Sequence, residues 1–580
     1  MNVNNKNLRR RSKKQSQDHE ARRGRVTSSA AIFSSLIIGL LPLPAISELP
    51  VILNNFGAPV KFQGANIPGA PYSNVYGGQT LQIDQFDDRA ILHWESFNVS
   101  ENNEVLFNQP GPSSIALNRV LGDVNAASII NGRITANGRV FIINHDGIVF
   151  GENAIVNTRS LLASTLDIRD DVFMDIGFEN AILEANGVDG EPQLPAFFKS
   201  KSFSRDMGEI VVENGAKIKV SAISTVDEDG VEKLELGRVM MFAPKITNKG
   251  EIATEEGQII LAAAEDEVYL AAADEEQSDL RGLVVGVRTG GEVTNLGSLI
   301  AERGNISLLG LAVNQEGLAR ATTSTALNGS IILKAQDFNR EPDDSIIQGN
   351  DVGGYEFKAE RGGALTLAAG SVTEVVPDEK TDASGDVITA TDALVQKASR
   401  IELGAEKVTL KSGSRVTATG GDIIIEAATN PRLESEFNSL NDPDLVEASV
   451  VIESGVLIDA SGDDTAVVSV SRNFVEVEAR GNELADSPLQ REGAIRDKTL
   501  TVDIRKGTDF LNIDGAVAAI ERDVHERLSP GGKVVINSTG NIDVEQGALI
   551  DVSGGTVSYT GDYVSTSKLV TASGEVHDIS

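Results

Sequence analysis

Short apolar runs separated by polar turns recur along this chain, most clearly between Asn131 and Ile168. The apolar runs in that stretch are Val140–Ile143, Ile148–Phe150 and Leu161–Ala163. Runs of three or four Val, Ile, Leu and Phe residues between turns are typical of short strands that are buried inside a sheet. No helical period fits the stretch, so it predicts strands and turns only.

The turns in this stretch are of two kinds. Asn131-Gly132 and Asn137-Gly138 are Asn-Gly pairs, which favour tight turns because both residues tolerate positive φ. The turn Asn144–Gly147 (Asn-His-Asp-Gly) is built from turn-forming polar residues throughout. We expect Asn144 and Gly147 to close a β-turn there, with His145 exposed to solvent.

A loose repeat follows downstream of Gly208. Each copy has a turn glycine, a three-residue strand and a turn of polar or small residues, and the longer copies add a second strand. The copies are 248–263, 295–310, 411–428, 453–462 and 545–555. The 47-residue and 42-residue spacings of their glycines fit two coils of about 20–24 residues each.

Such short strands bury an apolar face only by stacking on a neighbouring coil. The sequence therefore predicts an all-β fold, a right-handed parallel β-helix with an N-terminal cap and protruding loops or hairpins. At about 22 residues a coil, the chain would form roughly 24 coils and a rod on the order of 100 Å, less whatever loops remove.

Several segments depart from the repeat. Residues 48–111 are rich in large apolar side chains, including the single Trp94, and predict a cap over the open end of the stack. Residues 170–210 are irregular and predict a hairpin or a loop over the stack. Longer polar runs predict loops or lateral elements at 377–399, 431–447 and 472–530. Val517–Leu528 has apolar residues at helical spacing and predicts an amphipathic helix.

Residues 1–47 have the pattern of a secretory signal. Nine basic residues precede an apolar run from Ala30 to Leu43, which is too short for a membrane span. Ala45 and Ser47 place small residues before a predicted cleavage site at Glu48.

The net charge and the cysteine count limit the classes of function that the chain can have. The chain has no cysteine and a net charge of −34, which becomes −41 once residues 1–47 are removed. Such a surface repels nucleic acid, which excludes nucleic-acid binding, and it keeps a large secreted protein soluble. The absence of cysteine suits a chain that crosses a membrane unfolded, because no disulfide closes a loop too wide to thread.

At this point a family resemblance is visible. Its matching pieces are Trp94 with Phe97, Phe107 with Gln109-Pro110, Asn118-Arg119-Val120 and Ala163–Leu166. The chain resembles the N-terminal secretion domain of filamentous haemagglutinin-like exoproteins over about 48–290, most strongly over 80–170. The family's turn Asn-Pro-Asn-Gly-Ile reads Asn144-His145-Asp146-Gly147-Ile148 here, with the Pro and the second Asn replaced.

The resemblance implies two-partner secretion. The expected partner is an outer-membrane β-barrel transporter with periplasmic docking domains, and the expected destination is the surface or exterior of a Gram-negative bacterium. The implied product is an adhesin that binds a glycan or protein of a host cell or another surface.

The domains that the resemblance implies are a signal (1–47), a secretion domain (48–290) and a β-helical repeat region (291–580) that continues or is truncated. The residues implied in transporter recognition are Asn108, Gln109, Pro110, Asn118, Arg119, Asn144, His145, Asp146, Gly147 and Ile148. For Asn118 and Asn144, a second role stays open, in which they bond neighbouring backbone groups as part of a coil-stabilising ladder.

The sequence gives weaker support to other functions. The five histidines have no metal-spaced partners, and no phosphate-binding or nucleophile motif stands on the right elements, so we expect no enzyme, metal site or cofactor. The enzymatic alternative is a β-helix enzyme acting on polysaccharide through an acidic cluster. Its candidate residues are Asp459, Asp503, Arg505, Asp543 and Asp551, although Asp at strand–turn junctions is expected on structural grounds alone. A haem-binding or toxin-delivery exoprotein is a further alternative.

Overall fold

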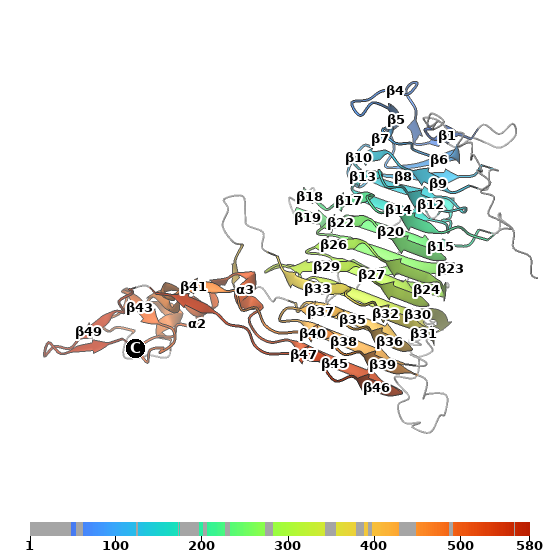
Figure 1. Cartoon of the computed structure of the whole chain (residues 1–580). Helices are drawn as coiled ribbons and strands as arrows, with labels where there is room; N and C mark the ends of the chain where they lie inside the picture. Colours follow the sequence, from blue (N-terminus) through green and yellow to red (C-terminus); the bar gives the residue numbers. More distant parts are fainter. Residues whose placement is uncertain are drawn as a thin grey trace, which may run out of the picture. The chain divides into compact units, whose positions relative to one another are not determined.

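The computed structural model describes residues 48–53, 62–122, 126–171, 173–174, 196–200, 206–226, 232–272, 282–342, 355–378, 388–391, 397–428, 448–485, 491–561 and 563–579. The predicted signal with Ala45 and Ser47, and the loop 431–447, lie outside these residues. Three long sheets of mainly parallel strands dominate the fold (Figure 1). We name them sheets A, B and C. The chain runs repeatedly through B, A and C, which makes the parallel β-helix that the sequence predicts.

The strands of sheet A are β1 (Val51–Ile52), β2 (Phe62–Gln63), β6 (Arg89–Ser96), β8 (Ile115–Val120), β11 (Arg139–Ile143), β14 (Ser160–Ser164), β20 (Arg238–Ala243), β23 (Gln258–Ala272), β27 (Asn305–Gly310), β30 (Ser330–Pro342), β35 (Arg400–Ala405), β38 (Asp422–Ala427) and β45 (Lys533–Ser538), joined at their margins by β15 (Phe197–Phe198), β24 (Leu283–Gly290) and β31 (Tyr355–Gly362). The strands of sheet B are β3 (Ala65–Asn66), β4 (Tyr72–Ser73), β5 (Gln79–Gln85), β7 (Glu104–Asn108), β10 (Arg133–Ala136), β13 (Ile155–Thr158), β17 (Lys217–Ser221), β22 (Glu251–Glu255), β26 (Ser298–Glu302), β29 (Leu318–Thr323), β33 (Val372–Pro377), β37 (Arg415–Ala418), β40 (Leu457–Asp459) and β47 (Leu549–Asp551). The strands of sheet C are β9 (Ser128–Ile130), β12 (Ile148–Phe150), β16 (Ile210–Val212), β21 (Lys245–Asn248), β25 (Glu292–Asn295), β28 (Ala312–Gln315), β32 (Ala364–Leu367), β36 (Lys407–Leu410), β39 (Ser449–Ile452) and β46 (Asn541–Val544).

The predicted number of coils is wrong. Sheet C has ten strands among the described residues, so the stack has about that many three-sided coils rather than 24. Regular coils have the expected length, since Arg133 pairs with Ile155 and Ser298 with Leu318. The 47-residue and 42-residue repeats, however, are single coils, because Glu251 pairs directly with Ser298 and Arg415 with Leu457. Excursions out of the stack account for the extra residues.

The excursions leave at only two of the three corners. Every connection from sheet C to sheet B in the described stack has two or four residues and contains a glycine. In a four-residue corner such as that of Gly413, the glycine supplies a positive φ of 80°. In a two-residue corner such as that of Gly297, a Cβ would lie 2.1 Å from the carbonyl oxygen of Gly250 in the preceding coil. The same steric reason applies at Gly132 and Gly138. Neither glycine has a positive φ, so the reason given for the Asn-Gly pairs, their tolerance of positive φ, does not hold there.

The predicted cap is confirmed. Strands β1 and β2 pair antiparallel with β6, and β3 and β4 pair antiparallel with β5, which closes the first parallel coil. Trp94 is fully buried beneath the cap. Phe62 and Phe97 pack edge-on against it, with ring centroids 5.7 and 5.5 Å from that of Trp94. Large aromatic side chains bury much apolar area at a stack end that has no coil above it.

The first coils have a second core outside the helix. Sheet A turns Ile91, Leu117, Phe141, Leu162 and Met240 outward, yet each is at most 1% exposed. An outer layer covers them, formed by the described parts of 165–174, by β15 and by the hairpin of β23 and β24. Described parts of the irregular region 170–210 thus lie over the stack, as predicted. The continuous apolar runs of this region reflect strands that are buried on both faces.

A smaller module lies outside the three sheets. It contains β41 (Val467–Ser469), β42 (Phe474–Glu478), β43 (Thr499–Asp503), β48 (Ser558–Thr560), β49 (Lys568–Val570), β50 (Val576–Asp578) and two 3₁₀ turns, at Val470–Asn473 and Gly481–Leu484, around its own apolar cluster. Two further pairs are β18 (Ile223–Val226) with β19 (Glu232–Glu235) and β34 (Ala390–Thr391) with β44 (Glu521–Arg522).

The single helix predicted at Val517–Leu528 is wrong. The structure has α2 (Asp514–Ala518), then β44, then α3 (Val524–Arg527). Asp523 interrupts the helix because its side chain accepts a hydrogen bond from the Glu526 amide at 2.8 Å and so begins a new helix. Among the described residues, no helix has the length and apolar character of a membrane span.

Candidate functional site

The structure separates the predicted recognition residues into two groups. Asn118 and Arg119 lie on β8, where they pair with Ile142 and Ile143 of β11, so the turn Asn144–Gly147 comes next to them at the sheet A-to-C corner. Asn108 ends β7, and Gln109 and Pro110 follow it in the connection to β8, at the opposite end of sheet A. The residues therefore form no single surface.

Asn118 is a buried support inside the coils. Its Nδ2 donates to the carbonyl oxygens of Ala116 and Phe141 at 3.1 Å, and its Oδ1 accepts from Trp94 Nε1 at 3.0 Å. These contacts join β6, β8 and β11 in three successive coils. Because Asn118 is 0% exposed, the ladder role that the sequence left open is the one its geometry shows.

Arg119 anchors the outer layer to sheet A. Its guanidinium donates to Asp167 Oδ1 at 2.9 Å, to Asp170 Oδ1 at 2.6 Å and to the carbonyl oxygen of Ile168 at 2.8 Å. Burial raises the pKa of Asp167 above the usual carboxyl value, although Arg119 opposes the shift. A cavity of about 430 Å³ beside this cluster is also lined by Arg169 and Lys199.

The turn Asn144–Gly147 is a structural corner. The Gly147 amide donates to the Asn144 carbonyl at 3.0 Å, which confirms the β-turn, and the Asp146 amide donates to Asn144 Oδ1 at 3.0 Å. The Nδ2 of Asn144 donates to Ser128 Oγ at 2.9 Å in the neighbouring coil. Gly147 has a φ of 111° and no room for a Cβ, which would lie 2.7 Å from the Glu209 carbonyl oxygen.

The expected exposure of His145 is wrong. His145 is 3% exposed and Asn144 is 2% exposed, whereas Asp146 is half-buried and Ile148 begins β12 in the core. The chain returns over the turn at 206–209, where the Gly208 amide donates to the His145 carbonyl oxygen at 2.8 Å. In the folded protein, the side chains of Asn144 and His145 are therefore not accessible to a partner.

The second group is partly exposed. Asn108 is exposed, with its Nδ2 2.8 Å from Asp84 Oδ1, and Pro110 is exposed beside it. Gln109 is buried, and its Nε2 donates to Gln85 Oε1, to the Ser114 carbonyl and to the Arg139 carbonyl at 2.9–3.1 Å. Asn108 and Pro110 are thus the predicted residues that the folded surface presents most openly.

Sequence reasoning missed a buried amide ladder. Asn248 Nδ2 donates to Asn295 Oδ1, and Asn295 Nδ2 donates to Gln315 Oε1, each at 2.8 Å across successive coils. All three side chains are 0% exposed. The signal was present, since each amide stands two residues before a corner glycine, in 248–250, 295–297 and 315–317.

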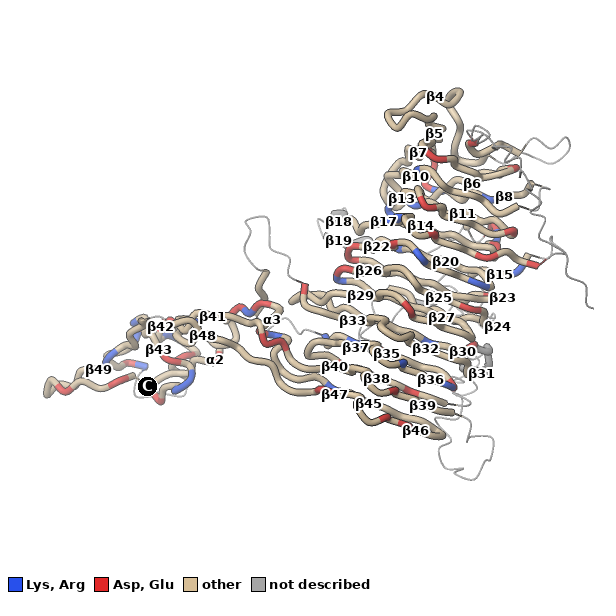
Figure 2. The backbone as a smooth tube through the Cα atoms, in the orientation of Figure 1, with Lys and Arg blue, Asp and Glu red and all other residues tan. Residues whose placement is uncertain are grey.

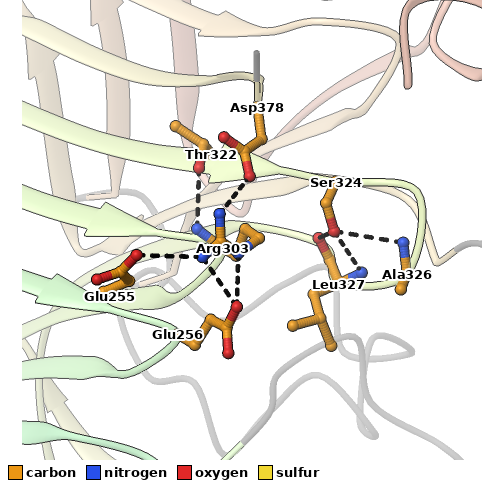
Figure 3. Close-up of polar contacts among 8 residues, drawn as sticks. All are labelled: Glu255, Glu256, Arg303, Thr322, Ser324, Ala326, Leu327 and Asp378. Atoms are coloured by element: carbon orange, nitrogen blue, oxygen red, sulfur yellow. Dashed lines mark hydrogen bonds and ion pairs between the residues drawn. The ribbon is translucent and has the colours of Figure 1, made fainter. Parts of the chain in front are cut away.

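An arginine clamp was also missed (Figure 3). Arg303 donates to Glu256 Oε1 at 2.9 Å and to Asp378 Oδ2 at 2.6 Å, and its backbone amide donates to Thr322 Oγ1 at 2.9 Å. Arg303 and Glu256 both have positive φ, at 50° and 52°. Burial lowers the pKa of Arg303, but the Asp378 and Glu256 carboxylates outweigh it and raise the pKa. The clamp joins turns from successive coils at one corner.

The acidic residues of the enzymatic alternative do not form one cluster. Asp459 on β40 and Asp551 on β47 are register partners, and Asp543 lies on β46. Asp503 ends β43, which belongs to another sheet, and forms an ion pair with Arg505. The described residues contain no group of three His, Asp or Glu side chains placed to hold a metal ion. Charged positions are spread along the stack instead of gathered in one patch (Figure 2).

Comparison with known proteins identifies one part of the chain. Residues 67–348 match the family model of the TPS secretion domain. A heme/hemopexin-binding protein of Haemophilus influenzae is 28% identical over 269 residues, which cover 45% of this chain and 26% of that protein. A second heme/hemopexin-binding protein from the same species is 36% identical over 114 residues, which cover 18% of this chain and 12% of that protein. The chain thus spans about a quarter or less of the curated relatives it matches. The crystal structure of the HMW1 secretion domain from Haemophilus influenzae aligns with a TM-score of 0.45 and 21% identity, covering 70% of this chain and 86% of that one.

Proposed function

We propose that this chain, whose residues 67–348 match the TPS secretion domain, is an exoprotein of two-partner secretion that is exported through the periplasm to the cell surface or beyond. Residues 48–290 direct it to its transporter. The transporter is an outer-membrane β-barrel with periplasmic docking domains. The observation that carries the proposal is the family match over 67–348, which takes in the stack from β3 to β30.

The fold supports a recognition step before folding is complete. Asn118, Asn144 and His145 are buried in the folded coils, so a transporter reaches their side chains only in an unfolded chain. The parallel ladders of the stack join strands of adjacent coils, so the chain can fold coil by coil as it emerges. Folding outside the membrane then opposes backward movement and helps to drive export.

Two variants test which form the transporter reads. Asn108→Ala with Pro110→Ala changes the exposed corner of the folded protein, and His145→Pro with Asp146→Asn restores the family's turn. If the transporter recognises the turn residues in the unfolded chain, only the variant with His145→Pro and Asp146→Asn changes the yield secreted through a co-expressed transporter. If it reads the folded surface, the first pair lowers the yield. Unchanged secretion after deletion of 80–170 would overturn the proposal itself.

The role after export is proposed as non-enzymatic surface binding, in the first place as an adhesin. A haem-binding role is the second candidate, because the matched relatives are heme/hemopexin-binding proteins. The two roles separate cleanly in experiment. Adhesion predicts binding of the purified protein to host cells or glycans, whereas haem binding predicts a saturable absorbance change on titration with haemin.

A further inference from the structure

The apolar outer face of sheet A is covered by two parts of the chain, which are 165–174 over the first coils and a hairpin that follows later. The face is formed by Ile91, Leu117, Phe141, Leu162 and Met240, which occupy one register column through the first coils. The described arms of the hairpin are 264–272 and 282–290. The parallel ladders of sheet A need no residue of these arms, and the second arm also lies beside β27 and β30, the next two strands of the sheet.

The hairpin also holds itself together. Its two arms pair antiparallel from Ala264–Gly290 to Ala272–Leu283. Glu267 accepts hydrogen bonds from Tyr269 Oη at 2.6 Å and from Arg288 Nη1 at 3.0 Å, so an ion pair ties the two arms. A unit with its own ladder and ion pair keeps its form when it moves.

Its attachment to the face is mostly apolar. Val268, Leu270, Leu283, Val285 and Val287 point into the second core and are at most 5% exposed. One side chain of sheet A also holds the hairpin, since Gln258 donates to the Leu283 carbonyl at 2.7 Å and accepts from its amide at 3.0 Å. Face-to-face packing of this kind separates without breaking the ladders beneath.

The base of the hairpin has the features of a joint. The register shifts between Ala264 and Glu267, where the apolar run of β23 is interrupted by Glu265-Asp266-Glu267. On the returning arm, Thr289 has a φ of 55°, in the left-handed region that β-branched residues rarely adopt. Irregular backbone on both arms at the same level favours bending there.

We propose that the β23–β24 hairpin is a closing strap, which docks on the outer face of sheet A after the coils beneath have stacked and opens without unfolding them. Resting on the proposed function, docking of the strap is the step that completes the secretion domain outside the cell. Until then, the part of the apolar face that the hairpin covers is exposed to solvent, and export of the domain remains reversible.

Hydrogen exchange on the folded wild-type protein tests the strap directly. Amides of 268–270 and 285–287 exchange about tenfold or more faster than those of Val140–Ile143 and Leu161–Ala163, because the strap opens locally. Equal rates in both sets would overturn the proposal.

A matched pair of variants provides the second test. Val285→Asp places a charge in the second core, whereas Val284→Asp changes the neighbouring side chain, which is 46% exposed. Val285→Asp raises exchange in the strap and binding of a hydrophobic dye while the ladders of β11 and β14 stay protected, and Val284→Asp does neither. Loss of protection in strap and ladders together overturns the strap.

Export distinguishes the two proposals. With a co-expressed transporter, Val285→Asp reaches the periplasm as wild type does but accumulates outside the cell several-fold less than Val284→Asp. Equal export of both variants would refute the closing step, whereas wild-type secretion that needs no transporter would refute the proposed function instead.

Discussion

The early and late coils of the same stack are stabilised differently. In the early coils, strands such as β11 and β14 have every residue buried, because sheet A packs on the helix core and on the outer layer. In the late coils, β35 and β38 alternate buried and half-buried or exposed residues, so sheet A is covered on one face only. One register column shows the change, since Ile260 is followed by Ser307, Ile332, Glu402 and Ile424 in successive coils.

The difference shows what the early coils require from the rest of the chain. A two-sided strand is stable only when a separate segment supplies the second layer, whereas a one-sided coil is complete once its neighbours have stacked. The early coils therefore depend on residues far along the chain, and the late coils depend on adjacent coils.

Two isoleucines in the same column provide the sharpest comparison. Ile260→Ala removes a fully buried side chain and is expected to cost about 2–5 kcal/mol of unfolding free energy. Ile424→Ala, at a half-buried position, is expected to cost about 0.5–1 kcal/mol. Urea unfolding of both variants measures this. Equal losses would contradict two-sided burial of the early coils.

The amide ladder tests the same division at another corner. Its register column continues as Leu367, Leu410 and Ile452 in the late coils, where aliphatic packing replaces hydrogen bonds. Asn295→Ala leaves the buried amides of Asn248 and Gln315 unsatisfied, which we expect to cost about 1–3 kcal/mol. Asn314→Ala, at a half-buried position on β28 next to Gln315, is the control and is expected to stay within about 0.5 kcal/mol.

The arginine clamp connects early coils to a later one. Arg303→Met leaves Asp378 and Glu256 without their cation and is expected to lower the unfolding free energy by about 1–2 kcal/mol. Arg320→Met, which breaks an ion pair with Glu374 where the arginine is 46% exposed, is expected to change it by less than about 1 kcal/mol. A larger effect of the Arg320 variant would reverse this order.

The smallest predicted effect is a pH dependence in the late coils. Burial of Glu402 raises its pKa, but Lys334 and Arg400 outweigh it and hold the pKa below the usual value of 4.5. The resulting stability is fully present above that value and is lost as the pH falls through the lower, folded pKa. Glu402→Gln should therefore flatten the decline of the urea midpoint in acid. Glu426→Gln controls for loss of one exposed negative charge, and a slope equal to wild type in the Glu402 variant would contradict the assignment.

Local pattern was sufficient to predict the architecture. The apolar runs and corner glycines predict stacked short strands, and Trp94 with its aromatic neighbours predicts the cap. The coil count is overestimated because it divides the whole chain by a single coil length, whereas excursions lengthen single coils to 47 and 42 residues. The helix at Val517–Leu528 was predicted from period alone, without weighing Asp523 as a start signal.

The candidate site was less predictable because its environment is non-local. His145 is buried by residues 206–209, and nothing in the Asn144–Gly147 segment signals that return. Arg303 meets carboxylates 47 and 75 residues away, which no local motif specifies. Asn118 was correctly considered for a ladder, but only the register of three coils shows which groups it bonds.

The uniform corners between sheets C and B have a consequence for engineering this protein. All ten corners have two or four residues. The two-residue corners hold a glycine in tight backbone contact with the preceding coil, and the four-residue corners, except that of Gly151, hold a glycine with positive φ, so we expect this edge to tolerate inserted sequence least. The other two edges already hold excursions of very different length, from the short hairpin of β18 and β19 to the long segment between β40 and β45 that contains β41, β42 and β43. An epitope or a foreign domain for surface display therefore belongs at those two edges, and the third provides a smooth side for immobilisation.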